Sequence, residues 1–577
     1  MFKKLFYLLL GFLLVFTPFK PAQTEAATLF PLDSTITGSL EKTETDDVYQ
    51  IQLDKPGRIT LTAKSYLYGM NVRVLDQEGM TEFYSKNIWY GTEAEPKQAE
   101  NSLDLEAGVY FIKIKKLDDY TGNYQLKVSF QSANNQDVEA NNTPSTAQPL
   151  TLNAKPIKGF LSEQDGIDYY KIQLLKPGRI NVTSKSYQYG MNVMLLSDDE
   201  VTDIDSDNLW YGTLEEPKSL TQTADLEAGT YYIKIKSLDS YTGTYDINVS
   251  YLAMNNQDVE PNQVKDDAQP FTLNSSTKTG FLSWSDNLDL YKITLSKPGS
   301  VTLSATSYLY GVRVELLDSN LDKAAIDSNV WYGTLTEPKR FVKTVDLEAG
   351  TYFIRLKNLD HYTGKYQLKL NYQAANNQDK KGNDTPKTAQ DLRLNSSLTG
   401  YLTWNDNIDV YKIKLTKSGK INFYTTSATY GLNVQLLKSN GITSVLSENI
   451  WYGSTKSPKR WNRTVKLSAG TYYIKINQLD NYTGKYAVRV NLLDTTPPAN
   501  PKVNKVKSSS TYITGKTEAN ATVTAYVGKT KIGTAKANKN GNYKIKISRK
   551  KAGTTLTIYA KDSSSNTSKP TKIKVTK

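Results

Sequence analysis

The sequence contains no cysteine and only one histidine among its 577 residues. Disulfide bonds and lipid attachment through a cysteine are therefore excluded, and each domain must be stabilised by its own hydrophobic core. Nucleophilic mechanisms that use imidazole as the base depend entirely on His361. The equivalent positions in three related segments are Asp119, Ser240 and Asn481, always before Tyr-Thr-Gly. We therefore expect His361 to be an exposed turn residue and the protein not to be an enzyme.

Long hydrophobic runs are also absent, apart from one at the start of the chain. Lys3 and Lys4 precede an uncharged, mostly apolar run over residues 5–19, and small residues follow up to Ala27. This pattern predicts a secretory signal peptide over residues 1–27, because the run is shorter than the roughly 20 residues that a membrane-spanning helix needs. The expected product is secreted and has no transmembrane anchor; an uncleaved membrane anchor is the alternative.

The net charge of +13 is distributed unevenly along the chain. Residues 27–374 contain 33 basic and 47 acidic side chains, residues 375–493 contain 17 and 7, and residues 494–577 contain 18 and 3. Lysine-rich β-domains attract polyanions, which for an exported protein are wall polymers, anionic glycans or a membrane surface. No nucleic-acid motif is present, so we expect no nucleic-acid partner.

Four tandem repeats account for most of the chain. Trp-Tyr-Gly begins at Trp89, Trp210, Trp331 and Trp451, at spacings of 121, 121 and 120 residues. A period of this length is too long for a solenoid unit, so each repeat should be a separate domain. The predicted domains are residues 28–133 (repeat 1), 134–254 (repeat 2), 255–375 (repeat 3), 376–493 (repeat 4) and a different tail at 494–577.

The local pattern within each repeat is that of β-strands. Tyr110, Ile112 and Ile114 alternate with Phe111, Lys113 and Lys115, while Lys-Pro-Gly, Ala-Gly and Tyr-Thr-Gly mark turns. No long amphipathic helix intervenes. The predicted fold class is all-β, with tandem β-sandwich or jelly-roll modules followed by a C-terminal Ig-like β-sandwich.

The order of these short motifs carries a family resemblance. Asp168-Tyr-Tyr-Lys-Ile, then Lys-Pro-Gly, Ala-Gly-Thr-Tyr-Tyr-Ile and Tyr-Thr-Gly, together with the upstream Glu260-Pro-Asn, resembles the bacterial pre-peptidase C-terminal (PPC) domain over residues 28–493. The resemblance implies β-sandwiches like those appended to secreted proteases, whose relatives include the collagen-binding modules of clostridial collagenases. The tail, with Thr-Thr-Pro-Pro after Asp494 and Thr-Gly-Lys-Thr-Glu-Ala-Asn-Ala from Thr514, resembles bacterial Ig-like domains.

The resemblance also implies calcium ligands, from the acidic segment before each repeat and from the loop before its Asp-x-Tyr strand. Carboxylate and amide oxygens from two segments suit the flexible oxygen shell of calcium. The expected ligands are Asp137, Glu139, Asn141, Asp165 and Asp168 in repeat 2, and Asp258, Glu260, Asn262, Asp286 and Asp289 in repeat 3. Repeat 4 departs from the pattern because Lys381 replaces the central glutamate, and repeat 1 lacks the acidic segment. Acid–base catalysis by the recurring carboxylate pairs and a hydrogen-bonded turn are the alternatives.

Aromatic residues form a second candidate site. The predicted ligand-binding residues are Tyr68, Trp89 and Tyr90, Tyr189, Trp210 and Tyr211, Tyr310, Trp331 and Tyr332, and Trp451 and Tyr452. Exposed Tyr and Trp can stack on sugars or grip a peptide, and repeated sites add avidity. The alternative is that each Trp fills the sandwich core. Tyr66, Tyr187 and Tyr308 extend the pattern, and Ala428 in repeat 4 argues against four equivalent sites.

These patterns predict a secreted, non-catalytic binding or adhesion protein of the bacterial surface or wall. Its expected partners are anionic cell-wall polymers or an extracellular glycan or protein ligand, with calcium as the possible cofactor. An accessory or substrate-targeting partner of a secreted hydrolase and a purely structural stalk are the two alternatives.

Overall fold

The computed structural model describes residues 27–43 and 46–577. The predicted signal peptide therefore lies, apart from its last residue, outside the described residues. Strands make up almost all the regular structure, and the all-β fold class is confirmed. The chain divides into two compact units, one holding the described part of residues 1–256 with 281–287 and 363–365, the other holding 257–280, 288–362 and 366–577. Among the described residues no helix has the length and apolar character needed to cross a bilayer.

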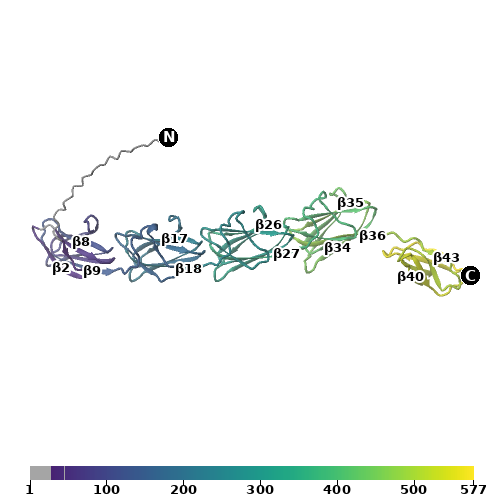
Figure 1. The fold of residues 1–577 in the computed structure, drawn as a ribbon, viewed down its shortest axis with the longest axis horizontal. Helices are drawn as coiled ribbons and strands as arrows, with labels where there is room; N and C mark the ends of the chain where they lie inside the picture. Colours follow the sequence, from purple (N-terminus) through teal and green to yellow (C-terminus); the bar gives the residue numbers. More distant parts are fainter. Residues whose placement is uncertain (1–26, 44–45) are drawn as a thin grey trace, which may run out of the picture. The chain divides into compact units, whose positions relative to one another are not determined.

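Each repeat folds into a five-stranded and a four-stranded sheet (Figure 1). The strands of repeat 1 are β1 (Thr28–Leu29), β2 (Ser34–Leu40), β3 (Asp46–Leu53), β4 (Gly57–Ser65), β5 (Gly69–Leu75), β6 (Glu82–Trp89), β7 (Lys97–Leu105), β8 (Gly108–Lys116) and β9 (Gly122–Ser132). The sheet orders are β1-β3-β8-β5-β6 and β2-β9-β4-β7. The first strand pairs in parallel with β3, and the other pairs are antiparallel.

Repeat 2 has the same topology after a single 3₁₀ turn, η1 (Pro144–Thr146). Its strands are β10 (Gln148–Pro149), β11 (Ile157–Leu161), β12 (Ile167–Leu174), β13 (Gly178–Ser186), β14 (Gly190–Leu196), β15 (Asp203–Trp210), β16 (Lys218–Leu226), β17 (Gly229–Ser237) and β18 (Gly243–Ala253). The sheets are β10-β12-β17-β14-β15 and β11-β18-β13-β16.

Repeats 3 and 4 have the same strand order. Repeat 3 contains β19 (Gln269–Pro270), β20 (Lys278–Leu282), β21 (Leu288–Leu295), β22 (Gly299–Ser307), β23 (Gly311–Leu317), β24 (Ala324–Trp331), β25 (Lys339–Leu347), β26 (Gly350–Asn358) and β27 (Gly364–Ala374). Repeat 4 contains β28 (Gln390–Asp391), β29 (Ser397–Leu402), β30 (Ile408–Leu415), β31 (Gly419–Ser427), β32 (Gly431–Leu437), β33 (Ser444–Trp451), β34 (Lys459–Leu467), β35 (Gly470–Gln478) and β36 (Gly484–Leu493).

The tail forms a smaller sandwich of a three-stranded sheet, β37-β38-β41, and a four-stranded sheet, β40-β39-β42-β43. Its strands are β37 (Lys502–Val503), β38 (Tyr512–Lys516), β39 (Thr522–Val527), β40 (Thr530–Lys536), β41 (Asn542–Lys546), β42 (Thr555–Lys561) and β43 (Thr571–Lys574). Ile513, Val523, Ile545 and Ile558 belong to its buried core. The alternation of buried and exposed residues along these strands is the pattern of sheets with one face buried.

A buried chain of hydrogen bonds joins the two sheets of each repeat. In repeat 2 the hydroxyls of Tyr170 on β12 and Tyr245 on β18 lie 2.6 Å apart, and the Tyr245 hydroxyl donates to Asp168. The same Tyr–Tyr–Asp arrangement recurs in the other repeats. Gly159 on β11 makes room for the Tyr245 ring, because a Cβ there would lie 2.1 Å from the Tyr245 Cζ atom.

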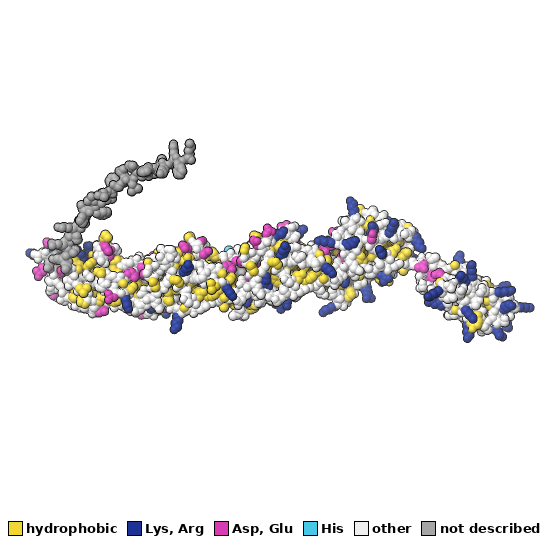
Figure 2. All heavy atoms as spheres, viewed as in Figure 1, with side chains coloured by type: hydrophobic (Ala, Val, Ile, Leu, Met, Phe, Trp, Pro, Cys, Tyr) yellow, Lys and Arg dark blue, Asp and Glu magenta, His cyan; other side chains and the backbone are white. Residues whose placement is uncertain are grey.

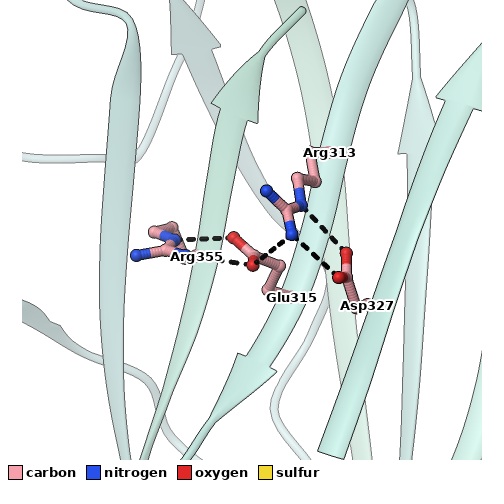
Figure 3. A network of polar contacts seen from close by, with 4 residues as sticks. All are labelled: Arg313, Glu315, Asp327 and Arg355. Carbon is pink, nitrogen blue, oxygen red and sulfur yellow. Dashed lines mark hydrogen bonds and ion pairs between the residues drawn. The ribbon is translucent and has the colours of Figure 1, made fainter. Parts of the chain in front are cut away.

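Repeat 3 carries its own charged network across three neighbouring strands (Figure 3). Glu315 on β23 is buried and receives two hydrogen bonds from Arg355 on β26, at 2.6 and 3.0 Å. Arg313 bridges Glu315 and Asp327 on β24, with Arg313–Asp327 bonds of 2.9 and 2.8 Å. Two guanidinium groups thus compensate the buried Glu315 carboxylate, because a buried charge without a partner would be strongly destabilising.

Neighbouring repeats also bond to each other directly. Within the first unit, the Thr242 hydroxyl donates to Asp104 at 2.8 Å, and the Glu163 amide donates to the Asp104 carbonyl at 2.9 Å. Within the second unit, Thr483 donates to Asp346 in the same way, at 2.6 Å. The Thr residue of each pair is the middle one of a Tyr-Thr-Gly turn. The equivalent position in repeat 4 is Lys466, whose side chain can only donate hydrogen bonds and offers no carboxylate acceptor.

We predict that Gly159→Ala destabilises repeat 2 by about 1–3 kcal/mol or more, because the added methyl group collides with the buried Tyr245 ring. Gly229→Ala is the matched control, since its Cβ would meet Tyr231 at an ordinary 3.6 Å. Hydrogen exchange of β11–β18 in the full chain measures the loss locally. Equal protection in the two variants would contradict the prediction.

Candidate functional sites

Three exposed tyrosines form a cluster on each repeat, which we call the tyrosine triad. The triads are Tyr68, Tyr90 and Tyr120; Tyr189, Tyr211 and Tyr241; Tyr310, Tyr332 and Tyr362; and Tyr430, Tyr452 and Tyr482. In repeat 2 the ring centroids of Tyr189 and Tyr211 are 5.1 Å apart, edge to face, and those of Tyr189 and Tyr241 are 4.7 Å apart. The other three triads have nearly the same geometry.

The middle residue of each Trp-Tyr-Gly motif has a backbone conformation that is unusual for tyrosine. Tyr90, Tyr211, Tyr332 and Tyr452 have φ between 64° and 66°, in the left-handed region. An aromatic residue there costs about 1–3 kcal/mol, and such strain concentrates at functional sites. The Tyr211 amide donates to the Tyr189 carbonyl at 2.7 Å, and the Tyr211 ring is 64% exposed. The strained residue thus presents its ring to solvent, where it gains little from packing.

The tryptophan of each motif lies beside the triad and outside the sandwich core. In repeat 2 a Cβ on Gly190 would meet the Trp210 ring at 2.7 Å, so the indole lies over the glycine backbone at the end of β14. Trp89 is 37% exposed, and the other three tryptophans are partly exposed. The interpretation of each Trp as core filling was therefore wrong, because the residue before each Trp faces the core and alternation along the strand turns the Trp to the outer face.

The structure brings together the predicted Tyr and Trp residues and adds one that the sequence patterns did not single out. The third tyrosine of each triad comes from the Tyr-Thr-Gly turn. In the sequence this motif indicates only a turn. Tyr187 lies outside the triad and donates to Asp246 at 2.7 Å. The counterpart of Tyr187 in repeat 4 is Ala428. This replacement therefore leaves the triad of repeat 4 complete, with Tyr430, Tyr452 and Tyr482 in contact.

The predicted calcium ligands form a second cluster, in repeat 2. Carboxylate oxygens of Asp137, Glu139 and Asp168 all lie within 4.8 Å of one another. With its amide turned over, the buried Asn141 side chain donates from its nitrogen to Glu139 at 3.2 Å and to Asp168 at 2.9 Å. Several carboxylates gathered at one place offer the oxygen ligands that calcium prefers.

Electrostatics in this cluster also suit a cation. Burial, with the neighbouring carboxylates adding to it, raises the pKa of Asp168 to about 9. Burial and repulsion by Asp165 raise the pKa of Glu139 to about 8. A bound divalent ion would hold both groups ionised. Asp165, the fifth predicted ligand, is buried and accepts a hydrogen bond from Asn142 at 2.8 Å.

Repeat 3 repeats the cluster with Asp258, Glu260 and Asp289, again within 4.8 Å. Here the Asn262 amide nitrogen donates to Glu260 and to Asp289, each at 2.6 Å. Asp286 is buried in the turn before β21.

Repeat 4 has an ammonium group among its carboxylates instead. Burial, together with repulsion by Asp384 and Asp379, raises the pKa of Asp406 to about 6, and the Lys381 charge only partly opposes this rise. Lys381 also donates to the Ala349 carbonyl at 3.2 Å. A hollow lined by Lys381, Asp379, Asp406 and Glu348 surrounds this position. The lysine supplies the positive charge that a cation would supply in repeats 2 and 3.

Comparisons with known proteins agree with these folds. The bacterial Ig domain family matches residues 497–577. Collagenase ColA of Clostridium perfringens (strain 13 / Type A) is 23% identical over 312 residues, which are 51% of this chain and 27% of the collagenase. The four repeats are thus similar to PPC domains, and the tail matches the bacterial Ig domain family.

Two further similar proteins are a protease and a solved domain. The cell wall-associated protease of Bacillus subtilis (strain 168) is 30% identical over 145 residues, 24% of this chain and 16% of the protease. The solved pre-peptidase C-terminal domain of a Bacillus anthracis collagenase is 23% identical and aligns over 99% of its length and 19% of this chain, with a TM-score of 0.16. The chain thus spans about a quarter or less of the length of the two proteases it matches.

We predict that Tyr211→Gly stabilises repeat 2 by about 0.5–1 kcal/mol relative to the wild type. Glycine adopts a positive φ without strain, and the exposed Tyr211 ring loses little burial. Hydrogen exchange at β14 and β15 provides the measurement, with Tyr211→Ala as the control that keeps the strain. A glycine variant less stable than the wild type would show that Tyr211 is kept for stability.

Proposed function

We propose that this protein is a secreted, non-catalytic binding protein of the bacterial cell surface, whose four PPC-like domains bind extracellular ligands through their tyrosine triads. The observation that carries the proposal is the left-handed tyrosine of Trp-Tyr-Gly, which recurs in all four domains with its ring exposed. Backbone strain retained four times, offset only by the edge-to-face contact inside the triad, is best explained by ligand contact.

The chemistry of a triad suits ligands with flat apolar faces and hydrogen-bonding edges. Tyrosine rings stack on pyranose rings and on proline rings, and their hydroxyls bond to the polar edges. The ligand classes are therefore glycans and proline-rich peptides such as collagen-like chains. Four sites on one chain raise the overall affinity for a repetitive polymer well above that of one site.

The C-terminal Ig domain contributes a different kind of attraction. Lys and Arg side chains crowd its surface in Figure 2, and residues 494–577 contain 18 of them against 3 acidic residues. Such a surface holds anionic wall polymers by charge alone, and high salt should release it.

Calcium is part of the proposal for repeats 2 and 3. Asp137, Glu139, Asn141 and Asp168 would hold the ion in repeat 2, with their counterparts in repeat 3. The ion would supply charge compensation to the buried carboxylates and tie the acidic segment before the domain to the start of β12. It takes no part in a reaction.

An accessory role beside a secreted hydrolase is a second candidate, favoured by the two matched relatives being named as a collagenase and a protease. A stalk without ligands is disfavoured, because it gives no reason for the partly exposed Trp89, Trp210, Trp331 and Trp451.

We predict that changing the two most exposed tyrosines of each triad to serine weakens binding to immobilised cell walls or to a triple-helical collagen-like peptide at least tenfold. Removing one triad should cost much less, since the others retain avidity. Pull-down of the mature chain measures the effect. The control changes Tyr187 and Tyr308, which lie outside the triads, to phenylalanine. Equal binding by the triad and control variants would refute the triads as binding sites.

We predict that calorimetry detects two calcium sites per chain, and that Glu139→Lys removes one of them. The substituted lysine imitates Lys381 of repeat 4 and places an ammonium among the carboxylates. Lys381→Glu should create a third site. Two sites remaining in the Glu139→Lys variant would contradict the assignment.

A further inference from the structure

The outer face of the four-stranded sheet in repeat 4 differs from that of its sister repeats. A hollow of about 420 Å³ opens on it, lined by residues of β29, β31, β34 and β36 that include Tyr424, Thr426, Arg460, Ala487 and Arg489. We call this hollow the repeat 4 groove. Its lining contains two arginines and, among the described residues, no carboxylate.

Strand register places these side chains in two adjacent rows. Tyr424 at the centre of β31 lies opposite Arg489 on β36 and Asn462 on β34. Two residues along, Thr426 lies opposite Ala487 and Arg460. Directly opposed residues on one face have their Cβ atoms about 5 Å apart, so the strand that carries Tyr424 lies between the strands that carry the two arginines, with Arg489 opposite Tyr424 and Arg460 one pair along.

The groove exists because large and small residues have exchanged places. Tyr424 stands where repeats 1–3 have Thr62, Thr183 and Ser304. Ala487 stands where repeats 2 and 3 have Asp246 and Gln367, which accept hydrogen bonds from Tyr187 and Tyr308. In repeat 4 the position of this tyrosine is occupied by Ala428. Both residues of the hydrogen-bonded pair are therefore alanines in repeat 4, and no large side chain covers the groove.

The groove's side chains have the properties of a binding surface. Tyr424 is 40% exposed and provides a flat apolar face. The Arg489 Nε atom donates to Asn491 at 2.8 Å, which fixes the plane of the guanidinium and leaves its two terminal nitrogens for a bidentate contact. Repeat 4 also has an excess of ten basic residues over residues 375–493, whereas residues 27–374 are net acidic.

From this arrangement we infer that the repeat 4 groove binds an acidic polysaccharide. One sugar ring stacks on Tyr424, its carboxylate or sulfate groups pair with Arg460 and Arg489, and its hydroxyls bond to Thr426 and Asn491. The groove is separate from the tyrosine triads and from the basic Ig domain, so it would bind even if the triads had no ligand.

The test is calorimetry of the full mature chain with two acidic probes, a tetragalacturonate and a heparin-derived tetrasaccharide. The first probe carries carboxylates alone and the second carries sulfates as well, so tighter binding of the second would show that sulfate adds to the contact. Tyr424→Ser and Ala487→Gln each restore the residue of repeat 3, so both should fold. Each should weaken binding about tenfold, because one loses the stacking face and the other fills the hollow.

Matched controls separate the groove from charge alone. Gln367→Ala in repeat 3 should change nothing, because Ser304 offers no ring there. Neutral maltotetraose should bind at least tenfold more weakly than the acidic sugars. An oligoglutamate with the same charge as tetragalacturonate should also bind at least tenfold more weakly than they do. The inference is overturned if neither acidic sugar binds, if both repeat 4 variants bind as the wild type does, or if oligoglutamate binds as tightly as the sugars.

Discussion

Each PPC-like domain depends on one chain of hydrogen bonds, which in repeat 2 runs from Tyr170 to Tyr245 to Asp168. It links a strand of one sheet to a strand of the other inside the sandwich, where an unbonded hydroxyl or carboxylate would be costly. It also holds Asp168 at the start of β12, facing the acidic segment before the domain. The core and the proposed cation site therefore share one carboxylate.

The same strand that carries Tyr245 begins at the Tyr-Thr-Gly turn, which has three separate roles. Its tyrosine completes the triad, its threonine bonds to the aspartate of the preceding domain, and its glycine has a positive φ of 143° in repeat 2. The proposed binding surface and the domain junction are thus built from adjacent residues. A change at this turn would affect both.

Much of this could be predicted from the sequence. Alternation of apolar and polar residues predicted the strands, and the spacing of Trp-Tyr-Gly predicted the repeats, because both patterns are local. The family resemblance named Asp137, Glu139 and Asp168 as neighbours, which the structure brings within 4.8 Å; whether they bind calcium stays a prediction, as do the domain boundaries.

What the sequence could not predict depends on contacts between distant strands. Tyr241 was missed because a turn motif gives no sign of which ring it faces. Ala428 suggests the loss of a site when only the sequence is known. Its counterpart Tyr187 instead bonds to Asp246 on the four-stranded sheet and lies outside the triad. The repeat 4 groove requires knowing that Tyr424 and Ala487 lie on adjacent strands, 63 residues apart.

The strained tyrosines are proposed to be retained for contact with a ligand. Hydroxyl-radical footprinting of the full chain, on purified cell walls and on a triple-helical collagen-like peptide, can detect this contact residue by residue. Ligand should protect Tyr90, Tyr211, Tyr332 and Tyr452 from oxidation, while partly exposed tyrosines outside the triads, the repeat 4 groove and the basic Ig domain, such as Tyr187, react as before. Bound chain in which these four residues remain as reactive as in the free protein would contradict this proposal.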